Sequence, residues 1–92
     1  MRLLWSAEAR ADRIAIWDYL AAENPAAAIR VDQAFADALE HLCGNPLLGR
    51  PGLVRGTRDL FPVGHYRIVY EVVDDTISVL AITHTSRLWP AQ

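Results

Sequence analysis

Apolar residues recur every three to four positions through the first half of the chain, and this spacing predicts two helices. A short strand is expected before them, over Arg2–Trp5, and Ser6 is a favourable residue for capping a helix. The first helix is predicted from about residue 7 to residue 22. Its expected buried face consists of the apolar residues that share one side, namely Ala7, Ala11, Ile14, Trp17 and Ala21.

The second helix is predicted to begin at Asn24-Pro25, because asparagine caps a helix and proline fits its first turn. Gly44-Asn45-Pro46 is expected to end it. Since the connection between the two helices is so short, they are expected to form an antiparallel hairpin. The apolar stripe along the second helix consists of Ala28, Val31, Phe35, Ala38, Leu39 and Leu42.

The second half of the chain has the pattern of strands. Residues 46–56 contain two prolines and three glycines and are predicted to be a loop. Three strand-like segments follow, over residues 57–63, 65–73 and 76–84, with Asp74-Asp75 as a hairpin turn between the last two. The order β-α-α-β-β-β predicts an α+β fold with one domain over residues 1–92. In that fold the two-helix hairpin packs on one face of a small, mostly antiparallel sheet.

A two-residue turn at Asp74-Asp75 would set the pairing of the last two strands. Arg67 would then oppose Ile82, and His65 would oppose His84. One face of this hairpin is nearly all apolar and is expected to pack on the helices. No element is left to cover the other face, which is typical of a partner or ligand site. That uncovered face is predicted to hold His65, Arg67, Val69, Glu71, Leu80, Ile82 and His84.

The composition excludes several classes of protein. The 92 residues are 52% hydrophobic and 22% charged, which is typical of a globular domain and not of a disordered chain. Cys43 is the only cysteine, so an intramolecular disulfide and a cysteine-based zinc site are both ruled out. The net charge of −2 argues against a protein that coats nucleic acid by bulk charge. No apolar run approaches a membrane span, so a cytoplasmic protein with no membrane partner is expected.

Basic residues of the second half are the candidate functional groups. No phosphate-binding loop, metal-ligand spacing or serine–histidine–acid order is present, so no cofactor and no metal are predicted. If Arg58, Arg67 and Arg87 converge with His84, they would suit a phosphodiester. The arginines would stabilise developing negative charge, and the histidine would move a proton. The alternative is a set of solvated arginines of little energetic value.

Six segments carry a further signal through their order and spacing: Ile16-Trp17-Asp18-Tyr19, Asn24-Pro25-Ala26-Ala27-Ala28, residues 45–52, Gly56-Thr57-Arg58-Asp59-Leu60, Tyr66-Arg67-Ile68-Val69-Tyr70 and residues 84–90. Over nearly its whole length the chain thereby resembles the RelE/ParE toxin superfamily of bacterial toxin–antitoxin modules. The resemblance implies a compact β-α-α-β-β-β fold. It also implies a cognate antitoxin that wraps and neutralises the toxin.

The superfamily divides by target. RelE-like members cleave messenger RNA in the ribosomal A site, and the resemblance places Arg58, Arg67 and Arg87 on basic positions of that site. His84 would substitute as the acid or base. Leu60 stands where a second basic residue is expected, and no tyrosine follows Arg87. ParE-like members poison DNA gyrase and are not nucleases.

The sequence favours the ParE-like target. The Ile-Trp-Asp-Tyr segment of the helical hairpin, the His-x-x-Arg-x-Trp-Pro ending and the net acidity all point toward it. A further alternative is a detoxified member that only binds its antitoxin and reaches operator DNA through it.

The antitoxin is predicted to dock on the uncovered sheet face. An apolar antitoxin segment would pack on the aliphatic residues there, and acidic antitoxin residues would lie near the arginines. Trp89 in the tail would either cover a sheet edge or stack on a base or on a side chain of a partner. The candidate contact residues are Arg67, Val69, Leu80, Ile82, Arg87 and Trp89.

Overall fold

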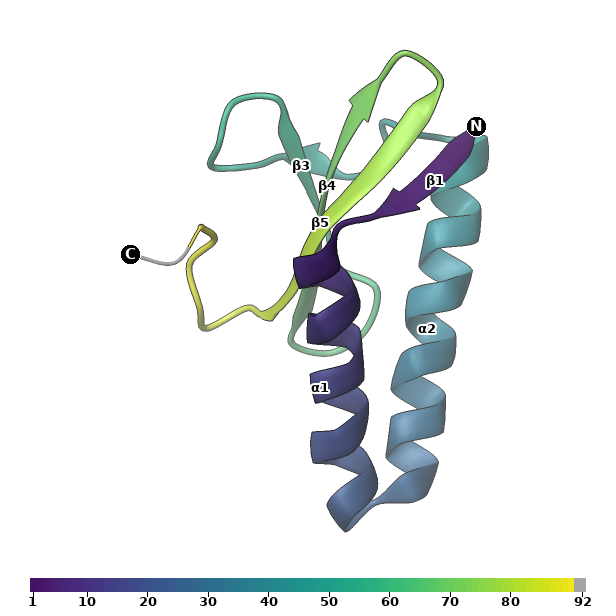
Figure 1. Cartoon of the computed structure of the whole chain (residues 1–92), viewed down its shortest axis with the longest axis vertical. Helices are drawn as coiled ribbons and strands as arrows, with labels where there is room; N and C mark the ends of the chain where they lie inside the picture. The colour runs from purple at the N-terminus through teal and green to yellow at the C-terminus, as the bar shows by residue number, and fades with distance from the viewer. Residues whose placement is uncertain (91–92) are drawn as a thin grey trace.

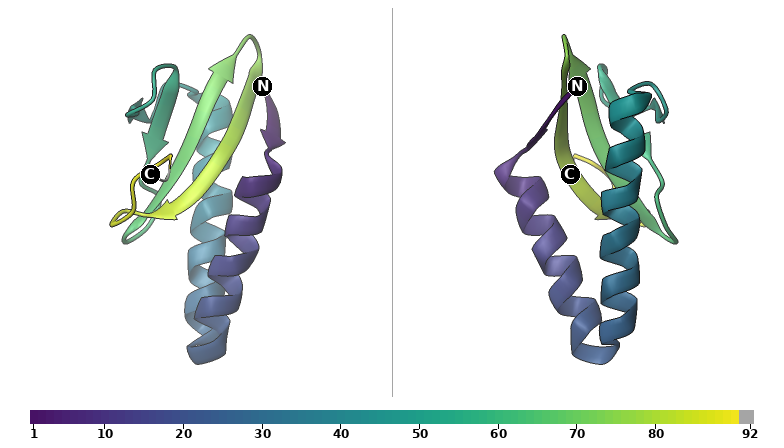
Figure 2. Two further views of the ribbon diagram at one scale, coloured as in Figure 1. Left: turned by 60° about the vertical axis from the view of Figure 1, so that its left-hand side comes forward. Right: turned by 90° about the vertical axis from the view of Figure 1, so that its right-hand side faces the viewer.

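Two helices and a five-stranded sheet form the computed structural model, which describes residues 1–90 (Figure 1). The helices run side by side from the turn at Asn24, and α2 lies across one face of the sheet (Figure 2). In chain order the elements are β1 (Arg2–Trp5), α1 (Ala7–Glu23), α2 (Pro25–Gly44), β2 (Arg50–Pro51), β3 (Thr57–Leu60), β4 (Tyr66–Val73) and β5 (Thr76–His84).

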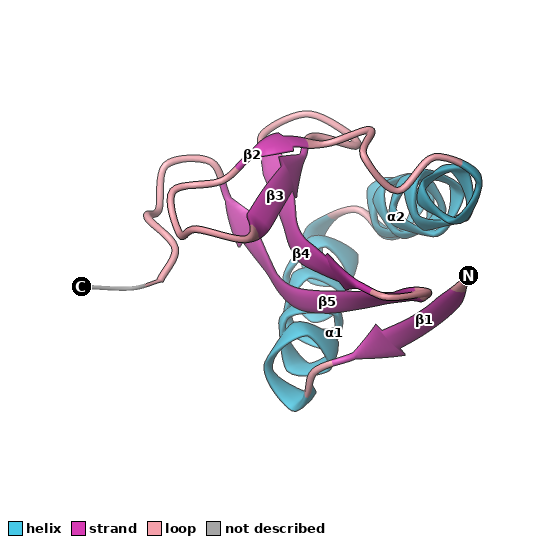
Figure 3. Ribbon diagram, turned by 90° about the horizontal axis from the view of Figure 1, so that it is seen from above, coloured by secondary structure: helices cyan, strands magenta, loops and turns pink. Residues whose placement is uncertain are grey.

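The strand order across the sheet is β1-β5-β4-β3-β2, as seen from above in Figure 3. Only β1 is parallel to its neighbour, β5, and the other pairs are antiparallel. The predicted α+β fold with its helical hairpin is therefore confirmed. The sequence missed β2, which lies in the segment predicted to be a loop and pairs with β3.

Side-chain caps set the boundaries of both helices. The hydroxyl of Ser6 accepts a hydrogen bond of 2.9 Å from the N–H of Ala9, and the carboxamide oxygen of Asn24 accepts one of 3.1 Å from Ala27. Pro25 occupies the first turn of α2, where its missing N–H leaves no partner unsatisfied. These are the cap residues that the sequence predicted.

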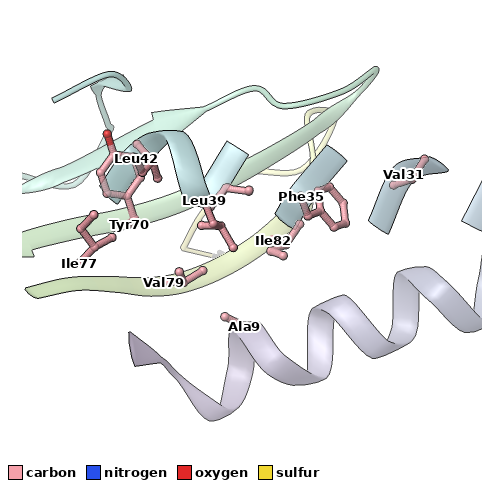
Figure 4. Packing of buried hydrophobic residues seen from close by; sticks show 10 residues of the cluster. Ala9, Val31, Phe35, Leu39, Leu42, Tyr70, Ile77, Val79 and Ile82 are labelled. Carbon is pink, nitrogen blue, oxygen red and sulfur yellow. The ribbon is translucent and has the colours of Figure 1, made fainter. Parts of the chain in front are cut away.

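The core lies between α2 and the sheet (Figure 4). Large residues of α2 at helical spacing, including Phe35, Leu39 and Leu42, are at most 3% exposed, which confirms the predicted apolar stripe. Phe35 also meets the ring of Tyr66 edge to face at 5.7 Å. From the sheet, the core receives Ile68, Tyr70, Ile77, Val79 and Ile82.

The predicted buried face of the first helix is wrong. Ile14 is 58% exposed and Trp17 is 40% exposed, whereas Ala9 is fully buried and Ile16 packs against the core from the other side of α1. Alanines occur all around this helix and therefore do not define a face. The side of α1 that faces the sheet also carries Asp12, whose carboxylate accepts a hydrogen bond from Ile82 of β5. A polar residue at this position interrupts the apolar pattern, so the sequence did not reveal the buried face.

The predicted pairing of β4 with β5 is right only near the turn. Val73 opposes Thr76 as expected, but a β-bulge at Leu80 inserts one extra residue into β5. Beyond the bulge, Tyr66 and not His65 opposes His84. The slip also moves Ile82 onto the helix-facing side, opposite Ile68, and its side chain enters the core.

Candidate functional site

Arg58 and Arg67 lie on opposite faces of the sheet. Arg58 opposes Tyr70, whose side chain points into the core shared with α2. Arg67 opposes Thr83, and both alternate with core residues along their strands, so both point away from the helices. The structure therefore does not bring Arg58 to the same site as Arg67.

Arg58 anchors the loop that follows α2. Its Nη1 donates a hydrogen bond of 2.7 Å to the carbonyl oxygen of Gly49. The hydroxyl of Tyr70 accepts one of 2.8 Å from the N–H of Gly49 and donates one of 2.9 Å to the carbonyl of Pro46. Both side chains thus hold the same short loop, which gives Arg58 a structural role that needs no ligand.

Tyr70 is fully buried, and burial raises its pKa because the phenolate would lose its hydration there. The hydrogen bond from Gly49 and the positive charge of Arg58 act in the opposite direction. The raised pKa keeps Tyr70 a neutral donor to Pro46 at physiological pH. A Cβ on Gly49 would come within 2.7 Å of the Tyr70 hydroxyl, so this close approach requires glycine.

Arg67 lies on the outer face, which is the sheet face opposite the helices. Its Nε is 3.8 Å from Oδ2 of Asp59, and its Nη1 donates a hydrogen bond of 3.3 Å to the carbonyl of Arg87. Its guanidinium lies 5.7 Å from the ring centre of Phe61, and that of Arg50 lies 4.6 Å from the same ring. Only 18% of the Arg67 side chain is exposed. Two arginines therefore gather around one aromatic ring, and one of them also lies beside a carboxylate.

Two buried polar atoms of the outer face have no hydrogen-bond partner among the described residues. They are Nε of Arg67 and Oγ1 of Thr83, which belong to residues that oppose each other across β4 and β5. The 3.8 Å separation from Asp59 is too long for a hydrogen bond. Both atoms are closed to solvent, so a polar group of a partner would reach them only if the side chains around them moved.

A groove of about 510 Å³ lies between α1 and the end of β5. Two of the four candidate catalytic residues, His84 and Arg87, line it, together with the carboxylate of Asp12 and aromatic side chains. Arg67 and Arg58 do not line it. The full set is Asp12, Ala15, Ile16, Tyr19, Tyr66, Ile82, Thr83, His84, Ser86 and Arg87.

The contacts of His84 determine which of its ring nitrogens can exchange a proton. Nδ1 accepts a hydrogen bond of 3.1 Å from the N–H of Ser86 and is 2.7 Å from the hydroxyl of the same residue. An accepting Nδ1 carries no proton, so the neutral ring holds its proton on Nε2. Nε2 is therefore the atom left to meet a ligand. The ring of His65 lies 5.7 Å away, centre to centre, although His65 does not oppose His84 in the sheet.

The candidate antitoxin contacts differ in how far they are exposed. Val69 is fully buried and Ile82 is 2% exposed, so the apolar strip expected on an uncovered face is not at the surface. The bulge turns the side chain of Ile82 from that face to the helix-facing side of the sheet. Leu80 and Trp89 are partly buried, and Arg87 is exposed.

Sequence reasoning missed several neighbours of these candidates. Asp59 and Phe61 were not connected with Arg67, although strand alternation places Asp59 on the same face. Arg50 was missed because its segment was predicted to be a loop, and Asp12 because the wrong face of α1 was predicted to be buried.

Among residues 1–90, no group of three or more His, Cys, Asp or Glu side chains is placed to hold a metal ion. Over the same residues, no helix combines the length and the apolar character needed to cross a membrane.

A family model of the ParE toxin of type II toxin–antitoxin systems, parDE, matches residues 3–89. The chain belongs to the ParE toxin family. The match includes the groove, the outer face and the loop held by Arg58. Membership of the RelE/ParE toxin superfamily, expected from the sequence, is therefore confirmed.

Two curated relatives place this ParE family member among toxins. It is 35% identical to Toxin RelE2 of Caulobacter vibrioides, over 95% of this chain and 98% of that protein. It is 31% identical to the putative toxin Y4kP of Sinorhizobium fredii, over 97% of this chain and 93% of that protein. The chain is a type II toxin–antitoxin toxin of the ParE/RelE superfamily.

Solved structures share the fold. A chain from the chromosomal ParDE system of P. aeruginosa is 28% identical, with a TM-score of 0.79 over 91% of this chain and 95% of that chain. A YoeB/ParE toxin from Agrobacterium tumefaciens is 16% identical, with a TM-score of 0.66 over 91% of this chain and 98% of that chain. The second likeness concerns the fold alone.

Proposed function

We propose that this toxin inhibits DNA gyrase and does not cleave messenger RNA. The observation that carries the proposal is the position of Arg58 and Arg67 on opposite faces of the sheet. Stabilising the charge that develops on a scissile phosphate requires donors that converge on one group. Arg58 is bound to the carbonyl of Gly49 and Arg67 points to the outer face, so the two do not converge.

The comparisons support the same target. The matching family model describes the ParE toxin, and the 28% identical structure comes from a ParDE system. The net charge of −2 also argues against a protein that must compete for ribosomal RNA.

The groove favours a second candidate function, which is RelE-like cleavage of messenger RNA. His84 and Arg87 line this groove together, and Toxin RelE2 is a 35% identical relative. In this alternative, Nε2 of His84 would exchange a proton with the substrate, and Arg87 would stabilise negative charge on the phosphate.

A cognate antitoxin is the partner that membership of the ParE family implies. We place its acidic segment on the outer face, where the guanidinium groups of Arg50 and Arg67 lie around the ring of Phe61. Arg87, Leu80 and Trp89 would contact the same antitoxin. Operator DNA would be reached only through the antitoxin.

The deciding experiment induces the toxin without antitoxin and follows labelled thymidine and labelled amino-acid incorporation over the first minutes. Under the gyrase proposal, thymidine incorporation fails first, and the purified toxin blocks supercoiling by gyrase in the absence of ribosomes. Early failure of amino-acid incorporation, with cleaved messenger RNA, would instead establish the second candidate. Unimpaired growth at full expression would indicate a detoxified member that only binds its antitoxin.

Variants in the groove sharpen this comparison. Cleavage of RNA through the groove requires that His84→Ala and Arg87→Ala each abolish toxicity. Arg30→Ala, on the exposed surface of α2, is the matched control because it also removes one polar side chain. Full toxicity of His84→Ala, at an expression level equal to that of Arg30→Ala, supports the gyrase proposal.

A further inference from the structure

The outward side of α1 carries an apolar stripe that no element of the described chain covers. We define the α1 stripe as Ala7, Ala11, Ile14 and Trp17, all of which are exposed. Ile14 is 58% exposed and Trp17 is 40% exposed. Large exposed apolar residues that adjoin on one helix face are typical of an interaction surface.

One end of the α1 stripe is hollow. A depression of about 410 Å³ is lined by Ala7, Arg10, Ala11 and Ile14, together with Trp5 of β1. The four helix residues stand at positions i, i+3, i+4 and i+7, which is the set that forms a hole for a side chain of a facing helix. Two of the four are alanines, so the hole suits a bulky side chain.

We propose that this hollow receives Trp17 of a second copy of the chain, with the two α1 helices antiparallel about a two-fold axis at Ile14. The hole is centred between Arg10 and Ala11, and Trp17 lies nearly the same distance beyond Ile14 along the helix. The two-fold axis therefore brings Trp17 of each copy level with the hole of the other. This assembly goes beyond the proposed action on gyrase and does not depend on it.

Charges on the same helix are complementary in this arrangement. Arg10 stands four residues before Ile14 and Asp18 four residues after it, so the antiparallel pairing places them side by side twice. Both are exposed, and neither forms an ion pair within residues 1–90. Complementary charges at an interface select the partner and set its orientation.

The self-complementary pattern favours a second copy over an unrelated partner. The hole and the Trp17 side chain that would fill it lie on one helix, on either side of Ile14. Arg10 and Asp18, which would form the charge pair, also lie on either side of Ile14. Ala7 of one copy would also meet Ala21 of the other, and such small residues let two helices approach closely. A single helix pair is smaller than the roughly 1,200–2,000 Å² of a standard interface, so a dissociation constant in the micromolar range is expected.

Charge exchange tests the pairing. Sedimentation equilibrium of the purified chain should show a monomer–dimer equilibrium. Arg10→Asp or Asp18→Arg alone should weaken it about tenfold or more, because like charges then face each other twice. The double variant should restore dimerisation to near the original level, and circular dichroism verifies that all three variants are folded. A chain that is monomeric at about 100 μM, or a double variant no tighter than the singles, would overturn the proposal.

A cross-link tests the axis. With Cys43→Ser as background, Ile14→Cys should form a disulfide-linked dimer on mild oxidation because the two thiols meet at the axis. Ala22→Cys, which is also exposed, is the matched control. Its two thiols would lie about 24 Å apart along the helices and should not cross-link. Equal cross-linking of both variants would contradict the arrangement. If the chain is monomeric and antitoxin protects the thiol introduced by Ile14→Cys, the stripe belongs to the antitoxin interface and the proposal is overturned.

Discussion

Oδ2 of Asp12 accepts a hydrogen bond of 3.0 Å from the main-chain N–H of Ile82, and this contact joins α1 to β5 two residues after the bulge at Leu80. The partner β1 ends at the level of Val79, so no strand is paired with β5 on this side of Ile82 in the described chain. The carboxylate of Asp12 thus supplies the hydrogen-bond acceptor that a neighbouring strand would otherwise provide. The same contact holds α1 in the position where it lines the groove together with His84 and Arg87.

Replacing Asp12 with alanine should lower the free energy of unfolding by about 1–3 kcal/mol, because the N–H of the buried Ile82 would lose its acceptor. Asp12→Asn keeps an acceptor oxygen and should lose clearly less. Urea unfolding of the two variants measures the difference. Equal losses for both would mean that the hydrogen bond contributes little.

Gly49→Ala should destabilise the chain, because the new Cβ would stand 2.7 Å from the Tyr70 hydroxyl and 2.8 Å from the carbonyl of Asp59. Overpacking of this kind costs about 1–3 kcal/mol. The matched control is Gly44→Ala at the end of α2, where nothing lies within 4 Å of the added Cβ. That variant should be neutral or more stable by up to about 1 kcal/mol. A thermal unfolding midpoint that falls equally in both variants would contradict the tight contact at Gly49.

The sequence predicted α2 better than α1 for a physical reason. In α2 most of the large apolar side chains, such as Phe35 and Leu39, fall on one side, and burying them is the dominant favourable term. Ile29 is the exception among the described residues of α2, with 61% of its surface exposed. In α1, alanines lie on both sides and the inward polar residues have partners distant in the chain. The face of α1 is therefore set by contacts with Asp32 and Ile82 that local periodicity does not contain.

The register error has a similar origin. Ser6 donates a hydrogen bond of 2.9 Å from its hydroxyl to the carbonyl of Leu80, and its N–H donates one of 2.9 Å to the carbonyl of Val79. The junction between β1 and α1 is thus hydrogen-bonded to β5 at the bulge. Because 74 residues separate Ser6 from Leu80, the turn at Asp74-Asp75 alone predicts only the part of the hairpin between the turn and the bulge. Because of this register error, Ile82 was expected on the outer face and was counted among the candidate antitoxin contacts.

Arg13 and Asp32 join the two helices through a bidentate pair, with Nε to Oδ1 at 2.6 Å and Nη2 to Oδ2 at 3.0 Å. This hydrogen bonding raises the pKa of Arg13, although partial burial opposes the shift. About a third of each side chain is exposed, so the coupling energy of a double-mutant cycle should be only about 0.2–1 kcal/mol and should fall in concentrated salt.

Arg13→Ala alone should cost more than Asp32→Ala alone. Its guanidinium also lies 5.2 Å from the ring centre of Trp5, and the alanine variant loses that contact as well. Equal effects of the two single variants in urea unfolding would show that the contact with Trp5 adds nothing.

Tyr70 should make the stability of the chain fall at alkaline pH. Burial raises its pKa in the folded state above the value of about 10 expected in the unfolded chain. The stability that follows from this shift is fully present below about pH 10 and is lost as the pH rises from there through the raised pKa. Tyr70→Phe should remove that part of the pH dependence.

The Phe variant should also cost about 1–3 kcal/mol at neutral pH, because the N–H of Gly49 and the carbonyl of Pro46 lose their partner. Tyr19→Phe is the control, since it also removes one tyrosine hydroxyl but at a side chain that is 73% exposed. Urea unfolding between about pH 8 and pH 11 compares the three chains. If Tyr70→Phe retains the slope of the unaltered chain, the buried hydroxyl is not the group that titrates.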